Sequence, residues 1–524
     1  MRIFAFFLCT AWLAAGPVDD QVNLALARAT GAGLIRTAIG VTRTGASIPA
    51  LITKDDLDFD TPKHRVLIVA GLEGSQAGVN AAIEALLTAA PGYSISAVPV
   101  ANPEGYAHGN RMNGVGGDPT KGYPPQGEHY GSASNPEAQY LWRWIPMHAP
   151  DLVVVVGQSE LTAALNKAGA VPAIEVAPYG KILPKILAAS IALSPARAEM
   201  QKRLRRTPLE VAKQLAQVYG KELPEAVYIP AMALVARLKL GDLTNDPSQL
   251  AMVEKIVEPF FSGARDSMAK PTGSHLSGHL VFGDLYARTL KPRYLEMARA
   301  AANTGFDTRG NMRESMPMHS EMSDSVFMGC PIAAQVGRLT GEKKYTDLAV
   351  RHMRFMLNLN LRPDGLHRHS PLDESAWGRG NGFPALGLAL ALSESKSVDE
   401  EMLSQFRAHM EAMLPHQDPT GAWHQVVDRP ESYRELTVTC MTAFAMQRGI
   451  SRGWLSWAKF APAVDRAWYA IKTRVAPDGS LVDVCTGTGK QKSIRDYYDR
   501  GAIFGPDPRG GAMSFLVATE LAAR

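Results

Sequence analysis

From about residue 206 onward, the sequence repeats an apolar helix at intervals of roughly 50 residues. These helices are rich in small and apolar residues, and they end near Leu240, Thr289, Thr340, Ser393 and Gly449. Each is followed by a turn and a second, amphipathic helix, so the repeating unit is one helical hairpin. A hairpin cannot bury its apolar face alone, and this repeat therefore predicts hairpins that pack side by side.

The two helices of each hairpin differ in where their apolar residues lie. The first is apolar nearly all round, as in residues 385–392, and is expected to be buried on most sides. The second, such as residues 344–357, carries charges along one face and is expected outside. The last helix, at 511–523, has no partner after it, but residues 207–219 could supply one. About six hairpins closing into an (α/α)6 toroid is the favoured arrangement, although an open superhelix would have the same period.

A different pattern fills the chain between residues 34 and 179. Short β-branched runs, at 65–70, 95–101, 151–156 and 173–177, are bounded by Gly and Pro, as buried strands are. Helical stretches at about 79–89 and 136–147 fall between them, and Thr44-Gly45 predicts a hairpin ahead of them. We therefore expect an α/β domain with a mostly parallel or mixed sheet over residues 17–195, and the toroid over residues 206–524.

The N-terminus predicts export. An apolar run from 3 to 15 follows Arg2, is broken only by Thr10 and ends in small residues, which is typical of a secretory signal peptide over residues 1–16. No later segment supplies the roughly 20 apolar residues that a membrane-spanning helix needs. A periplasmic or secreted protein with no membrane partner is expected.

Charge and cysteine content narrow the function classes further. The chain has 55 Lys and Arg against 51 Asp and Glu, a net charge of +4, so there is no electrostatic case for binding nucleic acid. Beyond the predicted signal peptide the cysteines are Cys330, Cys440 and Cys485. At most one disulfide could form among them, and buried free thiols are the favoured interpretation.

Polar and aromatic residues gather in three loops that each precede a predicted inner helix. In a ring of hairpins such loops meet at one rim, where a cleft can form. The loops contain His319 and Asp324; then His367, His369 and residues 377–383; and then Trp423, His424 and residues 433–435. Their phase with the repeat predicts a site, although His319, His367 and His424 are each more typical of hydrogen-bonded structural residues.

The side chains in these loops suit an acidic sugar. Trp377, Phe383 and Trp423 could offer flat apolar faces to a sugar ring, and Arg379 has the donor fork that suits a carboxylate. Burial at the start of an apolar helix would favour the protonated form of Asp324, as a general acid requires. The competing interpretation is that Asp324 merely caps that helix.

Three motifs in this region resemble those of the unsaturated uronyl hydrolases of glycoside hydrolase family 105. They are residues 323–328, residues 377–382 and residues 430–435, and residues 487–489, 497–500 and 510–512 extend the likeness over about 225–524. The resemblance implies a six-hairpin α/α toroid. It also implies hydration of the C4=C5 double bond of a terminal unsaturated uronate, after which the hemiketal opens and expels the neighbouring sugar, with no cofactor or metal.

Carried over residue by residue, the resemblance makes Asp324 the proton donor to C4 and the group that activates water. It implies that His369 contacts the ring and that Arg379 and Trp377 hold the uronate. The remaining expected substrate-binding residues are His275, Asn381, Phe383, Trp423, Tyr433 and Glu435. Two departures stand out, because Phe383 replaces a frequent Trp and His275 lies where relatives have another Asp.

The N-terminal part resembles a zinc carboxypeptidase domain, on residues 39–49, 70–76 and 98–106. In that family the second segment carries H-x-x-E and a later strand ends in a His ligand. Here Glu73 and Gln76 take the first positions and Gln158 the last, so we expect that no metal is bound. Glu175 alone matches the general base.

Several alternatives remain open from the sequence. The toroid could hydrolyse a saturated uronoside with two carboxylates, for which Asp324 and Glu435 are the candidate pair. The N-terminal domain could act as a peptidase or amidase, or the chain could bind uronates without catalysis. From chain order alone, the N-terminal domain is expected to cover one rim of the toroid.

Overall fold

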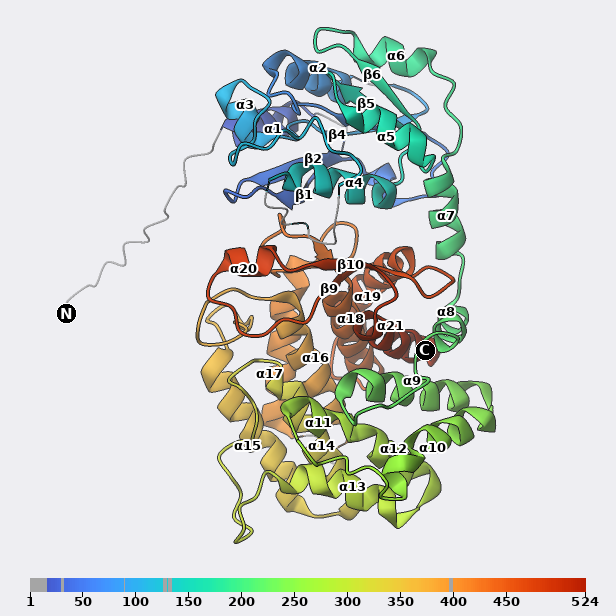
Figure 1. Cartoon of the computed structure of the whole chain (residues 1–524), viewed down its shortest axis with the longest axis vertical. Helices are drawn as coiled ribbons and strands as arrows, with labels where there is room; N and C mark the ends of the chain where they lie inside the picture. Colours follow the sequence, from blue (N-terminus) through green and yellow to red (C-terminus); the bar gives the residue numbers. More distant parts are fainter. Residues whose placement is uncertain (1–16, 30–32, 89, 126–129, 131–133, 395–398) are drawn as a thin grey trace, which may run out of the picture.

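The computed structural model describes residues 17–524 except 30–32, 89, 126–129, 131–133 and 395–398. The predicted signal peptide, residues 1–16, lies outside the described residues. The chain forms an α/β part and a helical part, which Figure 1 shows one above the other. Helix α7 (Pro195–Leu204) runs between them along one side and leads into α8 (Pro208–Ala216).

The α/β part is built on one mixed sheet of the order β1-β2-β4-β3-β5-β6. Its strands are β1 (Ile35–Val41), β2 (Ser47–Ile52), β3 (His64–Val69), β4 (Tyr93–Val98), β5 (Leu152–Val156) and β6 (Ala173–Val176). The last four strands are parallel, whereas β1 and β2 form the predicted antiparallel hairpin and β2 also runs antiparallel to β4. Gly45 turns the hairpin at a φ of +97°, which glycine adopts without strain.

Helices cover both faces of the sheet, as the near-continuous apolar strands require. They are α1 (Pro17–Arg28), α2 (Gln76–Leu87), α3 (Pro103–His108), α4 (Pro136–His148), α5 (Glu160–Ala168) and α6 (Ile182–Ala188), with a short 3-10 turn at Lys54–Leu57. Because successive side chains of a strand point to opposite faces, Val66 packs in the core beneath α2, whereas Leu67 packs in the core that contains α4.

The helical part is a closed ring of six hairpins within the described residues. Its inner helices are α9 (Tyr228–Thr244), α12 (Leu280–Thr289) with the preceding turn α11 (Gly273–Gly278), α14 (Ser325–Thr340), α16 (Gly378–Ser393), α18 (Leu436–Ser451) and α21 (Pro508–Ala522). The outer helices are α8, α10 (Pro247–Phe261), α13 (Pro292–Asn303), α15 (Lys343–Asn360), α17 (Glu400–Met413) and α19 (Trp457–Arg474), and a 3-10 turn follows at Leu414–His416.

The ring closes because α21 packs against both α9 and α8, so residues 208–216 do supply the missing partner. This confirms the toroid and excludes the open superhelix. Close packing of α16 on α14 depends on Gly387, since a Cβ there would lie 2.6 Å from the Phe327 Cα. Small residues on the inner helices therefore set how closely they approach.

The two parts share one continuous hydrophobic core. Ile39, Val41 and Tyr140 of the α/β part pack in the same cluster as Trp377 and Tyr497 of the helical part. Polar contacts add to it, since Arg434 donates to the Ala38 carbonyl at 3.2 Å. In agreement with the expectation from chain order, the α/β part lies on the side where α16 and α18 begin (Figure 1).

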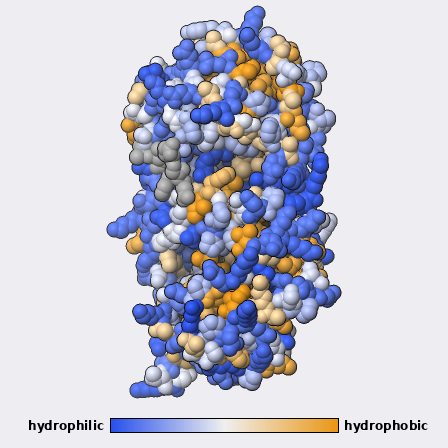
Figure 2. All heavy atoms as spheres, turned by 45° about the vertical axis from the view of Figure 1, so that its right-hand side comes forward, coloured by the Kyte–Doolittle hydropathy of each residue, from blue (hydrophilic) through white to orange (hydrophobic). Residues whose placement is uncertain are grey.

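The outer surface is mixed in character. Figure 2 shows hydrophobic residues in small, separated patches on a mainly hydrophilic face. No helix among the described residues combines the length and apolarity that crossing a bilayer demands.

Candidate functional site

Asp324 occupies the N-cap position of α14, yet its side chain caps nothing. It is 8% exposed, and its Oδ2 atom is buried without a hydrogen-bond partner among the described residues. That oxygen lies 3.2 Å from Nε2 of His369, an ion-pair distance without the angle of a hydrogen bond. The structure therefore does not support a mere capping role, and it leaves the carboxyl free for chemistry.

His369 is fully buried and fixed from two sides. Its carbonyl accepts the Ser323 N–H at 2.9 Å, and its Nδ1 lies 2.9 Å from the Tyr497 hydroxyl. Burial raises the pKa of Tyr497, so this hydroxyl stays protonated and can donate to Nδ1. The imidazole then carries its proton on Nε2, facing Asp324.

Trp377 and Arg379 complete the cluster from the first turn of α16. The His369 and Trp377 rings are 4.3 Å apart, and the Arg379 guanidinium lies 4.6 Å from the Trp377 ring centre. Arg379 donates to the carbonyls of Cys485 and Thr486, each at 2.8 Å, so its fork is held in one orientation. The buried Trp377 Nε1 has no hydrogen-bond partner among the described residues.

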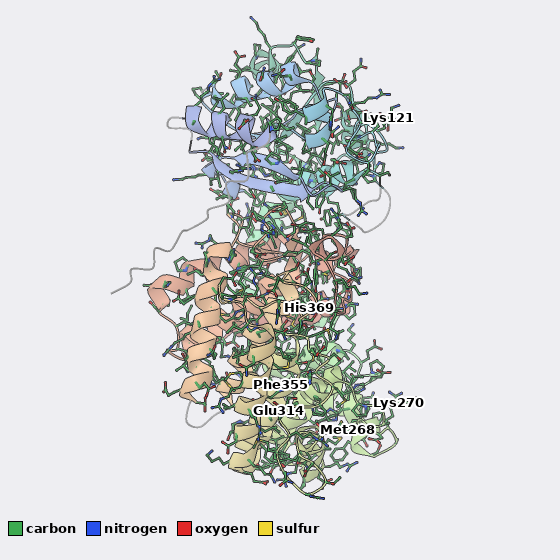
Figure 3. The ribbon with its side chains drawn as sticks, turned by 90° about the vertical axis from the view of Figure 1, so that its left-hand side faces the viewer. Lys121, Met268, Lys270, Glu314, Phe355 and His369 are labelled. Carbon is green, nitrogen blue, oxygen red and sulfur yellow. The ribbon has the colours of Figure 1, made fainter. Side chains whose placement is uncertain are left out.

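The structure thus brings together four of the predicted residues, namely Asp324, His369, Trp377 and Arg379. Figure 3 shows His369 in the half of the ring nearer the α/β part, with Phe355 and Glu314 farther from it. The cluster holds a carboxyl, an imidazole, an indole N–H and a guanidinium.

Tyr497 belongs to the cluster although it was not among the predicted site residues, and the family likeness covered it only within residues 497–500. Tyr228, at the start of α9, packs in the ring core. The Tyr228 ring packs edge-on against Phe327 and Phe383, and burial raises its pKa to about 12, with Arg379 opposing and Asp324 adding to the shift.

Three predicted sugar contacts are enclosed by protein instead. Trp423 is fully buried and donates from Nε1 to the Met413 carbonyl at 2.8 Å. Asn381 is fully buried too and braces the loop before α16 through the His367 backbone. Phe383 packs on Phe327 in the ring core. Because the polar groups of Trp423 and Asn381 already have partners within the protein and Phe383 packs in the core, their role as sugar contacts stays a prediction from the sequence.

Tyr433 and Glu435 also have structural partners. Tyr433 stacks at 4.9 Å on Tyr130 of the α/β part. Glu435 is fully buried and caps α18, because its carboxylate accepts from the Val438 N–H at 2.7 Å and the Cys485 N–H at 3.0 Å. A second catalytic carboxylate at this position is therefore not supported.

His275 makes no hydrogen bond to Asp324 within the described residues. It is half-buried in α11, and its Nδ1 lies 2.9 Å from the Thr272 hydroxyl. The other histidines of the loops are structural: the His319 ring packs on Phe355, His367 is fully enclosed, and His424 lies 3.3 Å from Asp418.

The loop before Asp324 has an unusual backbone. Met318, Ser320 and Glu321 have φ angles of +63°, +49° and +58°, which side chains other than glycine rarely adopt. Such conformations persist where surrounding contacts over-determine them, often beside functional sites. Here the Glu321 carbonyl accepts from Asn360 at 3.0 Å, and the His319 carbonyl accepts from Ser325 at 2.7 Å.

The residues that match zinc carboxypeptidase ligands do not gather into a metal site. Glu73 accepts the Gln158 N–H at 2.9 Å, and Glu175 is exposed on β6. Across the described part of the chain, no group of three His, Cys, Asp or Glu side chains could hold a metal ion. The likeness to carboxypeptidases stays a prediction.

One cavity, of about 290 Å³, lies between the two parts and is bordered by Phe59, Tyr469 and Arg474. It contains none of the four clustered residues.

A profile of Glycosyl Hydrolase Family 88 matches residues 200–524, which is more than half of the chain. The chain belongs to glycosyl hydrolase family 88. It is 31% identical over 209 residues to the unsaturated rhamnogalacturonyl hydrolase YesR of Bacillus subtilis (strain 168), covering 37% of this chain and 58% of that protein. An unsaturated 3S-rhamnoglycuronyl hydrolase of Formosa agariphila is 27% identical over 181 residues, covering 30% and 48%. The chain thus spans about half the length of these curated relatives.

Solved structures share the fold of the helical part. A possible member of the GH105 family from Klebsiella pneumoniae superposes with a TM-score of 0.52 at 19% identity, covering 64% of this chain and 94% of that one. A glycoside hydrolase from family 105 of C. acetobutylicum gives a TM-score of 0.51 at 18% identity, covering 60% and 99%.

Proposed function

We propose that this family 88 protein hydrates the C4=C5 double bond of a terminal unsaturated uronate on short acidic oligosaccharides and so releases the neighbouring sugar. The observation that carries the proposal is the unpartnered Asp324 Oδ2, 3.2 Å from His369 Nε2 and beside Trp377 and Arg379. This arrangement sets a proton donor next to aromatic and cationic groups that suit an acidic sugar.

The reaction needs one proton and one water. Protonated Asp324 gives its proton to C4, and the electron pair of the double bond forms the new C4–H bond. Positive charge develops at C5 and is shared with the ring oxygen. The carboxylate left on Asp324 then takes a proton from water as the water oxygen bonds to C5.

The product of hydration is a hemiketal, which opens and expels the neighbouring sugar. The glycosidic bond is therefore never attacked directly. His369 orients the Asp324 carboxyl, while Arg379 and Trp377 face the uronate. The positive charge of Arg379 attracts the uronate carboxylate, and its two carbonyl partners keep the fork in place.

The test is loss of ultraviolet absorbance, because hydration removes the conjugated double bond. Asp324→Asn should abolish turnover while the melting temperature stays near that of the wild type. Asp347→Asn is the matched control, since it makes the same change on the outer helix of the same hairpin, where Asp347 pairs with Lys343. Full activity of Asp324→Asn would refute the proposal, and uronate binding without turnover by the wild type would indicate a binding protein.

The names of the two curated relatives, which specify rhamnogalacturonyl and 3S-rhamnoglycuronyl units, suggest the first oligosaccharides to screen. We also propose that the protein is periplasmic or secreted, on the strength of the apolar run at residues 3–15. Cell fractionation tests this, and retention of the full-length chain in the cytoplasm would contradict it.

A further inference from the structure

The segment from β9 (Leu481–Cys485) to α20 (Ile494–Tyr498) contacts two side chains of the candidate site, those of Arg379 and His369. The carbonyls of Cys485 and Thr486 each accept one hydrogen bond, from the Nη1 and the Nη2 atom of Arg379 respectively. The hydroxyl of Tyr497 lies 2.9 Å from His369 Nδ1. Any shift of this segment would therefore move the cation and the imidazole of the site together.

The α/β part contacts this segment near its N-terminal end, at Asp483. Asp483 has a φ of +64° and lies where the pairing of β9 with β10 (Ala502–Gly505) is irregular, as at a β-bulge. The Tyr130 hydroxyl donates to its carboxylate, and the Arg143 guanidinium lies 3.8 Å from the same oxygen. Arg474 of the ring is the third partner, at 3.4 Å.

The α/β part also contacts the C-terminal end of the segment, near Asp499. The β1–β2 hairpin supplies both contacts: Arg43 pairs with the Asp499 carboxylate, and the Thr42 carbonyl accepts from Arg495 at 2.7 Å. Arg495 in turn donates to Asp499 at 3.0 Å. In Figure 1, β9, β10 and α20 lie between the ring and the α/β part.

We propose that the α/β part is a positioning element of the active site, with Tyr130 and Arg43 as its positioning residues. An unfavourable backbone conformation such as that of Asp483 persists only where its surroundings over-determine it. Tyr130 and Arg143 supply those surroundings from outside the ring. The α/β part thus fixes residues 483–499, and through them the Arg379 fork and the His369 ring. The inference rests on the function proposed above.

Loss of the contacts at Asp483 and loss of the contacts near Asp499 should affect different kinetic constants. Tyr130→Phe keeps the ring stacking but removes one of the three partners of Asp483, so the Arg379 fork should loosen and KM should rise about tenfold. Arg43→Gln removes one of the two hairpin contacts at the end near Tyr497, so kcat should fall about tenfold and its pH profile should change. Arg43→Lys should restore kcat.

Matched controls lie within the α/β part. Arg36 pairs with Asp19 at 2.6 Å, and Tyr123 donates to the Pro119 carbonyl at 2.9 Å, so both of these contacts lie within the α/β part. Arg36→Gln and Tyr123→Phe should retain wild-type kcat and KM. A merely structural loss would lower the melting temperature without separating kcat from KM.

Hydrogen exchange of the full-length chain gives a readout that does not depend on activity. In Tyr130→Phe and Arg43→Gln, backbone exchange should rise both at residues 481–500 and at residues 366–382, which carry His369 and Arg379. Faster exchange at 481–500 with unchanged exchange at 366–382 would overturn the inference, as would wild-type kinetics. If the wild type has no activity on unsaturated uronides, the proposed function fails and the exchange result still decides the positioning role.

Discussion

Tyr497→Phe isolates the contact that orients His369. The substitution removes only the hydroxyl and keeps the ring, which stacks on Trp377 at 6.3 Å and lies edge-on to His369 at 5.8 Å. Both Tyr497 and His369 are fully buried, so water cannot replace the lost donor without rearrangement. His369 Nδ1 would remain buried without a partner.

Leaving a buried acceptor unpaired costs about 1–3 kcal/mol. If the imidazole turns away from Asp324 to recover a hydrogen bond, that free energy is lost in the transition state. Since each 1.4 kcal/mol changes a rate about tenfold, kcat should fall between about 5-fold and 150-fold. KM should change little, because Arg379 keeps both carbonyl partners.

The assay follows the ultraviolet absorbance of an unsaturated uronide across a range of pH, with thermal unfolding measured in parallel. Tyr498→Phe is the control, because that neighbouring hydroxyl donates to Glu431 at 2.6 Å and not to His369. Wild-type kcat and an unaltered pH profile in Tyr497→Phe would refute the reasoning, since His369 would then be oriented without this hydroxyl.

Three further predictions concern groups outside this contact. Glu435→Gln should lower the free energy of unfolding by about 1–3 kcal/mol, measured with urea, because Glu435 caps α18; lost turnover at full stability would instead favour a two-carboxylate mechanism. Burial lowers the pKa of His279 and of His352 to about 4, whereas the unfolded chain takes up protons below about 6.5. The free energy of unfolding should therefore fall between pH 6.5 and 4, by up to about 3 kcal/mol for each histidine, and a flat urea midpoint over that range would contradict this. Metal analysis of the purified protein should find no stoichiometric zinc, since Glu73 already accepts a backbone N–H; one tightly held zinc per chain would overturn this prediction.

The fold was largely predictable because the period of the sequence and the distribution of its apolar residues favour the same architecture. The 50-residue period fixes the hairpins, and the uniformly apolar inner helices leave only a ring in which they are enclosed. Strand runs in the α/β part were equally clear. Closure of the ring through α8 could be inferred only from the fact that the last helix, at 511–523, lacks a partner after it. Residues 207–219 lie at the opposite end of the helical part of the chain, so no local pattern links the two.

The site was predictable only in part, for a physical reason. Polar residues at the start of an inner helix can cap it or face a ligand, and both uses favour the same residue types. Asp324 and Glu435 look alike in sequence, yet one caps nothing and the other accepts two backbone N–H groups. Tyr497 was part of the family likeness but was not assigned to the site, because it is 128 residues from His369 and sequence spacing carries no sign of that contact.

The three buried free cysteines can report which region of the native protein opens, because a thiol reacts only when solvent reaches it. Cys485 lies in the core that the two parts share, whereas Cys330 and Cys440 lie inside the ring. An alkylating reagent can reach Cys485 once the parts separate locally, but it reaches the other two only when the hairpins themselves come apart. Relative labelling rates of the three thiols in the wild-type protein, measured by mass spectrometry, therefore distinguish local separation of the two parts from global unfolding.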